Sequence, residues 1–173
     1  MRRLLIVVDM QKDFIDGALG TAEAQAIVEP LVKLAGQYSQ EDIIATRDTH
    51  PENYLDTQEG HNLPVVHCVK DTPGWQLDPR VQAAIGEAKI IDKPTFGSWQ
   101  LAEEVAKMAE KEELEITLCG LCTDICVVSN ALLLKARLPE TKVRVAASCC
   151  AGVTPATHAA ALETMKMCQV EQV

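Results

Sequence analysis

The sequence of 173 residues has few aromatic residues, no long apolar run and no excess of basic charge. Its first apolar run, Leu4 to Val8, is far shorter than the roughly 20 residues of a membrane span, and it is too short for a signal peptide. Lys and Arg number 16 against 25 Asp and Glu, which gives a net charge of −9. Nothing therefore offers a basic face to phosphates. We expect a cytoplasmic protein that binds neither nucleic acid nor membrane.

Cysteine is the one unusual abundance, with seven residues. The number is odd and no secretory signal is visible, so the sequence predicts free thiols rather than a disulfide framework. The length fits one domain with a sizeable core, and no repeat or linker divides it. We therefore expect one domain over residues 1–173.

Apolar stretches with β-branched residues alternate with helical patterns along the chain. This alternation predicts an α/β fold of three layers, a mostly parallel sheet with helices on both faces. The expected strands are 4–8, 43–46, 89–91, 114–118 and 143–147, with a further short one within 169–173. The expected long helices are 22–36, 98–111, 125–136 and 155–167.

Reactive side chains follow four of these strands. Asp9, Asp48, Lys93 and Cys126 each lie at or just past the carboxyl end of an expected strand. In open parallel sheets, ligands bind beyond these ends. An aspartate after a strand is usually only a turn residue, so it is the joint placement of the four that favours a functional site.

The stretch 114–136 provides the candidate nucleophile. Its strand is expected to break at Gly120, and Thr123 or Asp124 can cap the helix that follows. Cys126 then lies in the first turn of a largely apolar helix. Free N–H groups and the helix dipole favour a thiolate at such a position.

Asp9 and Lys93 complete a catalytic interpretation. A cysteine with an ordinary pKa of about 8.5 is mostly protonated at neutral pH, so it needs a base or a cation nearby. Asp9 could accept the thiol proton and return it to a leaving group, while Lys93 could orient Asp9 and stabilise the thiolate. The alternative is a buried structural cysteine with a separate Asp–Lys pair on the surface.

A second alternative is redox chemistry. Cys119 and Cys122 form a C-x-x-C motif, as in thioredoxin-like proteins. In those proteins the first cysteine begins the helix, whereas Cys119 is expected to end a strand. The hydrolytic interpretation is therefore favoured over the redox one.

Three of the four histidines, His50, His61 and His67, fall within eighteen residues. Asp48 and His50 with one further histidine and a carboxylate form a plausible ligand set for zinc, iron or manganese. Glu59 is the preferred carboxylate, with the competitors Asp56 and Glu52, and His61 competes with His67. The alternative is a polar loop with surface histidines.

Four groups of residues resemble a known family. They are Val8-Asp9-Met10-Gln11-Lys12-Asp13-Phe14, Arg47-Asp48-Thr49-His50-Pro51, Lys93-Pro94 with Phe96, and Gly120-Leu121-Cys122-Thr123-Asp124-Ile125-Cys126-Val127. A fifth match runs from Leu63 to Val69. Together they resemble the isochorismatase-like cysteine hydrolases, and within them the nicotinamidases, also called pyrazinamidases.

The resemblance implies roles for individual residues. The family's catalytic Asp, Lys and Cys correspond to Asp9, Lys93 and Cys126. The family's metal ligands correspond to Asp48, His50 and His67, and Glu59 is the expected fourth ligand where other members have a histidine or a glutamate.

The resemblance also implies an oxyanion hole from the backbone N–H groups of Cys122 and Cys126, with a cis peptide between Leu121 and Cys122. Phe14, Leu19 and Leu63 are expected to contact the substrate. Leu63 and Pro64 stand where many nicotinamidases have an aromatic residue.

The function implied is that of a metal-containing amidase. It would cleave nicotinamide or a similar small carboxamide to the acid and ammonia through a thioester on Cys126. Zinc is the expected metal, iron and manganese being the other options, and we expect a homo-oligomer. The competing hypotheses are an isochorismatase-type hydrolase of another small molecule and a non-enzymatic thiol or zinc module.

Overall fold

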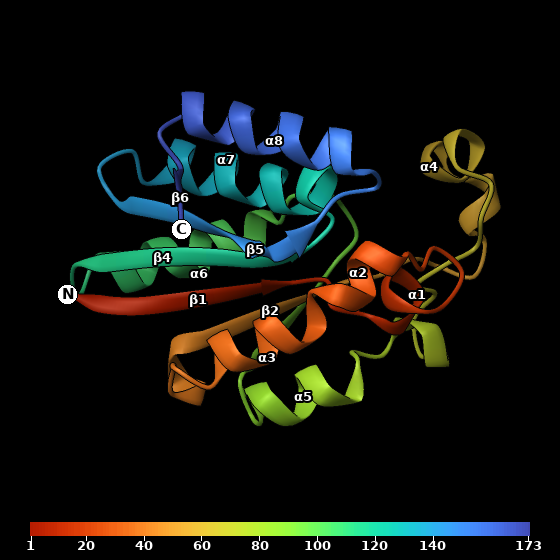
Figure 1. Ribbon diagram of the computed structural model, residues 1–173, viewed down its shortest axis with the longest axis horizontal. Helices are drawn as coiled ribbons and strands as arrows, with labels where there is room; N and C mark the ends of the chain where they lie inside the picture. The colour runs from red at the N-terminus through yellow and green to blue at the C-terminus, as the bar shows by residue number, and fades with distance from the viewer.

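The computed structural model describes all residues 1–173, and a six-stranded sheet forms its centre (Figure 1). All five strand pairs are parallel, and the order across the sheet is β3-β2-β1-β4-β5-β6. The strands are β1 Arg2–Val8, β2 Ile43–Asp48, β3 Lys89–Lys93, β4 Leu114–Leu121, β5 Lys142–Ala151 and β6 Glu171–Gln172.

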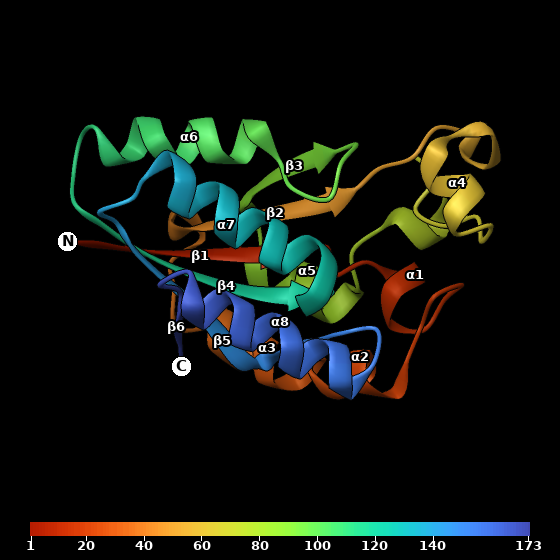
Figure 2. The same ribbon diagram turned by 90° about the horizontal axis from the view of Figure 1, so that it is seen from above.

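Helices cover both faces of the sheet. One layer contains α6 (Trp99–Ala109), α7 (Val128–Arg137) and α8 (Pro155–Met167), and the other contains α2 (Ala22–Ala26), α3 (Val28–Ala35) and α5 (Pro79–Ile85) (Figures 1 and 2). The short helices α1 (Lys12–Ile15) and α4 (Gln58–Asn62) lie beyond the carboxyl ends of the strands. The predicted three-layer α/β fold is therefore confirmed.

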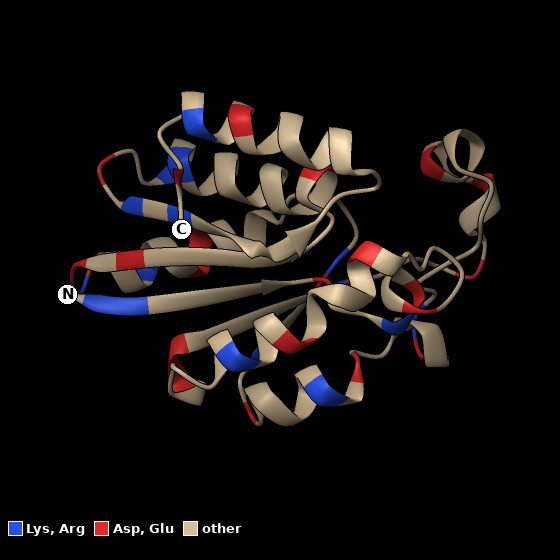
Figure 3. Cartoon of the chain, viewed as in Figure 1, with Lys and Arg blue, Asp and Glu red and all other residues tan.

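The core fills the space between the sheet and the helices. It is a single cluster of 39 buried residues, and all of Leu4 to Val8 belong to it. An unbroken apolar strand is what a parallel sheet covered on both faces requires. Figure 3 shows Lys and Arg spread over several helices and strands rather than gathered on one.

Two expectations about secondary structure were wrong. The expected helix 22–36 is divided into α2 and α3 at Ile27, because Pro30 has no N–H to donate to the carbonyl of Ala26. Strand β4 does not break at Gly120 but continues to Leu121. Gly120 has a φ of 116° and pairs with Val8, and a Cβ there would meet the Val8 carbonyl. The glycine thus permits a close approach of two strands rather than ending one.

The segment between β2 and β3 makes a long excursion at the carboxyl end of the sheet. It contains α4, α5 and the 3₁₀ turns Tyr54–Asp56 and Pro73–Trp75, and a third 3₁₀ turn, Gln40–Asp42, precedes β2. The excursion places α4 over the ends of the strands (Figure 2). None of the helices combines the length and hydropathy that a membrane span requires.

Candidate active site and metal site

Asp9 directly follows β1 and is completely buried. Its φ is 48°, a left-handed conformation that few non-glycine residues adopt and that often marks functional positions. Thr46 of β2 holds it, since its hydroxyl donates to Oδ1 at 2.6 Å. Oδ2 lies 2.6 Å from Lys93 Nζ, in an ion pair of two buried groups. Thr46 and Lys93 thus fix the position of the carboxylate.

Lys93 ends β3 and is only 1% exposed. Besides Asp9, its ammonium lies 3.4 Å from Cys126 Sγ and 3.7 Å from an oxygen of Asp48. It also donates to the carbonyl of Thr95. A buried cation is tolerated only when paired, and here the ammonium contacts both carboxylates and the thiol.

Cys126 lies in a π-helical turn, Thr123–Val127, that joins β4 to α7. Such turns are rare and occur mostly at functional sites. Neither Thr123 nor Asp124 caps the helix as expected: the Thr123 hydroxyl bonds to His158 at 2.8 Å, and Asp124 accepts from the Val153 N–H.

Asn130 supports the turn and was missed by the sequence analysis. Its amide donates to the carbonyls of Cys126 (2.8 Å) and Phe96 (3.1 Å), and its oxygen accepts from the Ser98 N–H. It joins the nucleophile's turn to the segment after Lys93. The available signal was a single amide residue within an otherwise apolar helix.

The electrostatics of Cys126 differ from expectation. Burial raises the pKa of its thiol well above the ordinary value, the charge of Asp9 raises the pKa further, and Lys93 lowers it. Burial and the charge of Asp9 therefore oppose the thiolate that a helix start favours. Burial also raises the pKa of Asp9 against the opposing effect of Lys93. The arrangement can transfer a proton from a nucleophile to an adjacent base.

The peptide bond between Leu121 and Cys122 is cis. No acceptor of the chain takes the N–H of Cys122, whereas its carbonyl accepts from Ile125 and Val127. A free N–H beside the nucleophile is what an oxyanion hole needs.

Asp48, His50, Glu59 and His67 form a second cluster, with one ligand atom of each within 4.8 Å of all the others. Nε2 of His50 lies 2.9 Å from Asp48 and 3.7 Å from Glu59, and Nε2 of His67 lies 3.7 Å from the same Asp48 oxygen. Two imidazoles and two carboxylates form a donor set that suits zinc, iron or manganese. The residues therefore fit a divalent transition metal.

Neighbouring groups orient these side chains. Nδ1 of His67 bonds to the Val65 carbonyl at 2.7 Å, which directs Nε2 into the cluster. Gln11 is completely buried, and its amide bonds to both the N–H (2.7 Å) and the carbonyl (2.8 Å) of Asp48. Gln11 was missed as a supporting residue, although it stands within a motif that we singled out.

Burial works against the charge of Asp48, but hydrogen bonds from His50 and His67 outweigh it and hold the pKa of this carboxyl well below its ordinary value. Asp48 also faces Lys93, so it links the cluster to the Cys126 site. The competing candidates Glu52, Asp56 and His61 are exposed and lie outside the cluster.

The redox alternative loses its geometric basis. Cys119 is completely buried within β4, its thiol faces the carbonyl of Ile6, and its pKa is raised well above the ordinary value by burial. Burial also raises the pKa of Cys122, to about 12. Neither thiol has the thiolate character of a redox cysteine. All seven cysteines are free, as expected.

A cavity of about 270 Å³ opens between the two clusters. Cys126, Cys122 and the metal-site residues Asp48, Glu59 and His67 line one side of it. Most of the other lining residues are apolar, and they include the three expected substrate contacts, Phe14, Leu19 and Leu63. The cavity therefore gives a small, largely apolar molecule access to the thiol.

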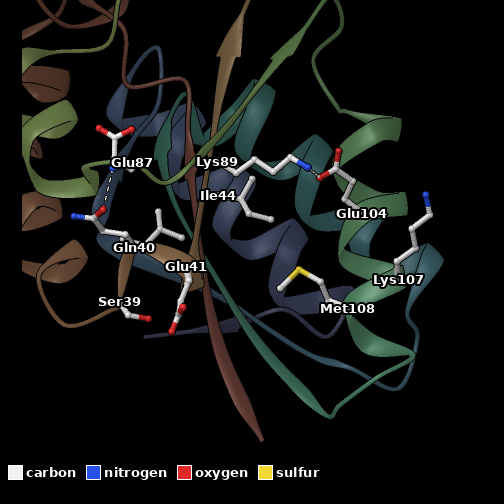
Figure 4. Close-up of a pocket in the computed structure, with 10 residues that line it drawn as sticks. Ser39, Gln40, Glu41, Ile44, Glu87, Lys89, Glu104, Lys107 and Met108 are labelled. Carbon is white, nitrogen blue, oxygen red and sulfur yellow. Dashed lines mark hydrogen bonds and ion pairs between the residues drawn. The ribbon is translucent and has the colours of Figure 1, made fainter.

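A larger hollow, of about 850 Å³, lies at the opposite end of β2 and β3 (Figure 4). Lys89 pairs with Glu104 there, and the backbone N–H of Glu87 donates to the side-chain oxygen of Gln40. Neither a cysteine nor a histidine lines it. The candidate catalytic and metal-binding residues lie instead at the smaller cavity.

Residues 3–173 match the family model described as the isochorismatase domain. The chain belongs to the isochorismatase family. Among curated members of this family, a nicotinamidase/pyrazinamidase of Mycobacterium tuberculosis is 29% identical over 99% of this chain and 98% of its own length. A nicotinamidase of Saccharomyces cerevisiae is 28% identical over 75% of this chain and 80% of its own.

A solved structure of a family member has the same fold. A pyrazinamidase of Pyrococcus horikoshii, solved in complex with zinc, superposes with a TM-score of 0.80 at 30% identity, covering 100% of this chain and 99% of that one. The family identified from the motifs is therefore confirmed, and the fold extends over the full length of both chains.

Proposed function

We propose that this protein is an amidase that hydrolyses nicotinamide or a similar small primary carboxamide to the carboxylic acid and ammonia. The observation that carries the proposal is the contact of one buried ammonium, Lys93, with both the nucleophile Cys126 and the carboxylate Asp9. The similarity to nicotinamidases and pyrazinamidases supports the substrate class.

In the first half-reaction, the Cys126 sulfur attacks the amide carbonyl carbon while its proton passes to Asp9. The raised pKa of the thiol makes such a base necessary. The oxygen of the tetrahedral intermediate would accept from the free N–H of Cys122 and from that of Cys126. Collapse breaks the C–N bond, the proton on Asp9 passes to the leaving nitrogen, and ammonia departs from an acyl thioester.

In the second half-reaction, water attacks the thioester carbonyl, and Asp9 takes one of its protons. The C–S bond then breaks, and the sulfur regains a proton. Burial raises the pKa of Asp9 and the positive charge of Lys93 opposes this, which favours the ionised base at the start of each half-reaction. Over both steps, amide and water become acid and ammonia, and the enzyme is unchanged.

Asp48, His50, Glu59 and His67 would hold one divalent metal ion, with zinc the first choice. Such an ion supplies Lewis acidity and lowers the pKa of bound water. The zinc complex of the Pyrococcus horikoshii pyrazinamidase supports this assignment, and so does the cluster of two imidazoles and two carboxylates.

The test is an ammonia-release assay with nicotinamide, pyrazinamide and other small amides, together with intact-protein mass spectrometry. We expect ammonia from at least one aromatic amide, and an acyl mass on Cys126 when the reaction is quenched early. Hydrolysis of a vinyl ether without ammonia release would instead identify an isochorismatase-type reaction and contradict the proposal.

A further inference from the structure

The reacting end of the substrate cavity is closed. Asp9 is completely buried, Lys93 is 1% exposed and Cys126 is 4% exposed. The leaving nitrogen must lie at this end, because Asp9 protonates it in the proposed function. Burial of these three side chains at the reacting end favours a primary amide, whose leaving nitrogen carries no substituent.

The acyl end of the cavity, by contrast, is open. Glu59, Leu63, Phe96 and Ile125 line both the cavity of about 270 Å³ and an adjoining groove of about 500 Å³. Ligand pockets commonly measure about 300–1,000 Å³, so the cavity alone suits a single small ring. Cavity and groove together suit a larger molecule.

Two apolar side chains at the junction have no protein partner that covers them. Leu63 is 38% exposed and Phe96 is 45% exposed. They come from different segments, the end of α4 and the turn after β3, and both line the cavity and the groove. Adjacent exposed apolar groups at the rim of a cavity are typical of a binding surface.

The charge of the groove also restricts its ligand. Beyond the shared residues, its lining consists of Gln58, Asn62, Pro94 and Thr95, which are all neutral. Glu59 is its only charged residue, and that carboxylate faces the metal cluster. A neutral substituent fits this lining, whereas a carboxylate would meet Glu59 without a compensating cation.

We propose that the groove between α4 and the segment Pro94–Phe96 binds an extension of the acyl group. The preferred substrates are then primary carboxamides of a small ring that carries a neutral, mainly apolar chain, rather than the bare ring. This inference rests on the proposed amidase function and specifies its substrate class.

The experiment compares kcat/KM for nicotinamide and benzamide with that for 3-butylbenzamide, 4-butylbenzamide and a benzamide whose chain ends in a carboxylate. We expect at least one butyl isomer to exceed benzamide by about tenfold, which corresponds to burial of about two of its methylenes at about 0.8 kcal/mol each. The carboxylate-ended amide should fall back to the benzamide level or below it.

Asn62→Trp tests the location, because Asn62 lines the groove but not the inner cavity. It should lower kcat/KM for the better butyl isomer about tenfold and change the value for nicotinamide less than twofold. His61→Trp is the matched control on the same helix, since His61 is exposed and lines neither hollow. It should change neither value.

The outcomes separate the two levels of the argument. The extended site alone is overturned if the enzyme hydrolyses nicotinamide but both butyl isomers react more slowly than benzamide. It is also overturned if Asn62→Trp affects all substrates equally. Absence of ammonia release from every amide overturns the amidase function and the extended site with it.

Discussion

Strands β2 and β3 have a hollow at each end, and the two hollows differ in size and in the state of their charged groups. At the amino ends the hollow measures about 850 Å³, and its lysine side chain Lys89 is 55% exposed. At the carboxyl ends the cavity measures about 270 Å³, and the side chain of Lys93, on the same strand, is 1% exposed. The larger hollow is thus at the amino ends of these strands, and the buried lysine is at their carboxyl ends.

The difference indicates which end carries the function. An exposed ion pair costs little and contributes little, so Lys89 and its partner need no special explanation. Burying Asp9, Asp48 and Lys93 together is costly, and a buried ion pair is weak evidence for stability. The carboxyl-end charges are therefore explained by the chemistry we propose for them, and the amino-end charges by solubility.

The largest expected effect is at the nucleophile. Cys126→Ser should lower kcat on the best amide by about 10⁴-fold or more, because loss of a nucleophile removes the covalent pathway. Cys168→Ser, at an exposed thiol, should leave kcat unchanged, and Cys122→Ser should keep substantial activity. Steady-state ammonia release measures all three. Equal loss in Cys122→Ser and Cys126→Ser would favour a two-thiol mechanism instead.

Asp9→Asn should have the next largest effect. The amide keeps the shape of the side chain and the bond from Thr46 but cannot take a proton, so kcat should fall about 10²–10⁴-fold. Metal content and thermal melting should stay close to wild type. A variant with a near wild-type rate would show that Asp9 is not the base.

The same carboxylate predicts the acidic limb of the pH profile. Burial raises the pKa of Asp9, and the base must be ionised to act. Activity should thus be present above this raised pKa and be lost as the pH falls through it, at a higher pH than for an exposed aspartate of pKa about 3.9. The pH dependence of kcat/KM measures it, and a limb near the exposed value would contradict the burial argument.

Much of the carboxyl-end site could be predicted from sequence, because strand-end residues of a parallel sheet share one edge. Asp9, Asp48 and Lys93 were placed by that rule alone. Cys126 was also placed at this edge, but the helix-start argument for its ionisation left out desolvation by the folded core, which raises the pKa of its thiol.

Supporting residues could not be predicted in the same way. Their partners are distant in sequence: Thr46 bonds to Asp9, Gln11 to Asp48, and Asn130 to Phe96, each more than thirty positions away. Gly120 was misinterpreted for the same reason. From its neighbours in sequence alone a glycine predicts a strand break, whereas in the structure a glycine is needed there because the backbone of the adjacent strand β1 lies too close for a side chain.

A more moderate effect is expected at the metal ligands. The protein purified without chelator should contain about one equivalent of a divalent transition metal by elemental analysis. Glu59→Gln should weaken zinc binding, measured by competition with a chromophoric chelator, because it removes one of four ligand groups. Glu52→Gln, in the same excursion but exposed and outside the cluster, is the control. Equal zinc affinities of Glu59→Gln and Glu52→Gln would show that Glu59 is not a metal ligand.

The smallest effect is expected at the amino-end hollow, where Glu104 pairs with Lys89. Burial acts to raise the pKa of Glu104, but bonds from Lys89 and Gln100 outweigh it and lower the pKa. Because the pKa of Glu104 is lower in the folded state, its ionised carboxylate stabilises the fold at pH values above the unfolded-state pKa of about 4.3. This stabilisation is lost as the pH falls through the folded-state pKa. Glu104→Gln should therefore cost about 0.2–1 kcal/mol at pH 7, and the difference from wild type should fade on acidification and in high salt. Urea unfolding at several pH values measures it, with kcat unchanged throughout. A loss of turnover in Glu104→Gln would contradict the assignment of the chemistry to the carboxyl end alone.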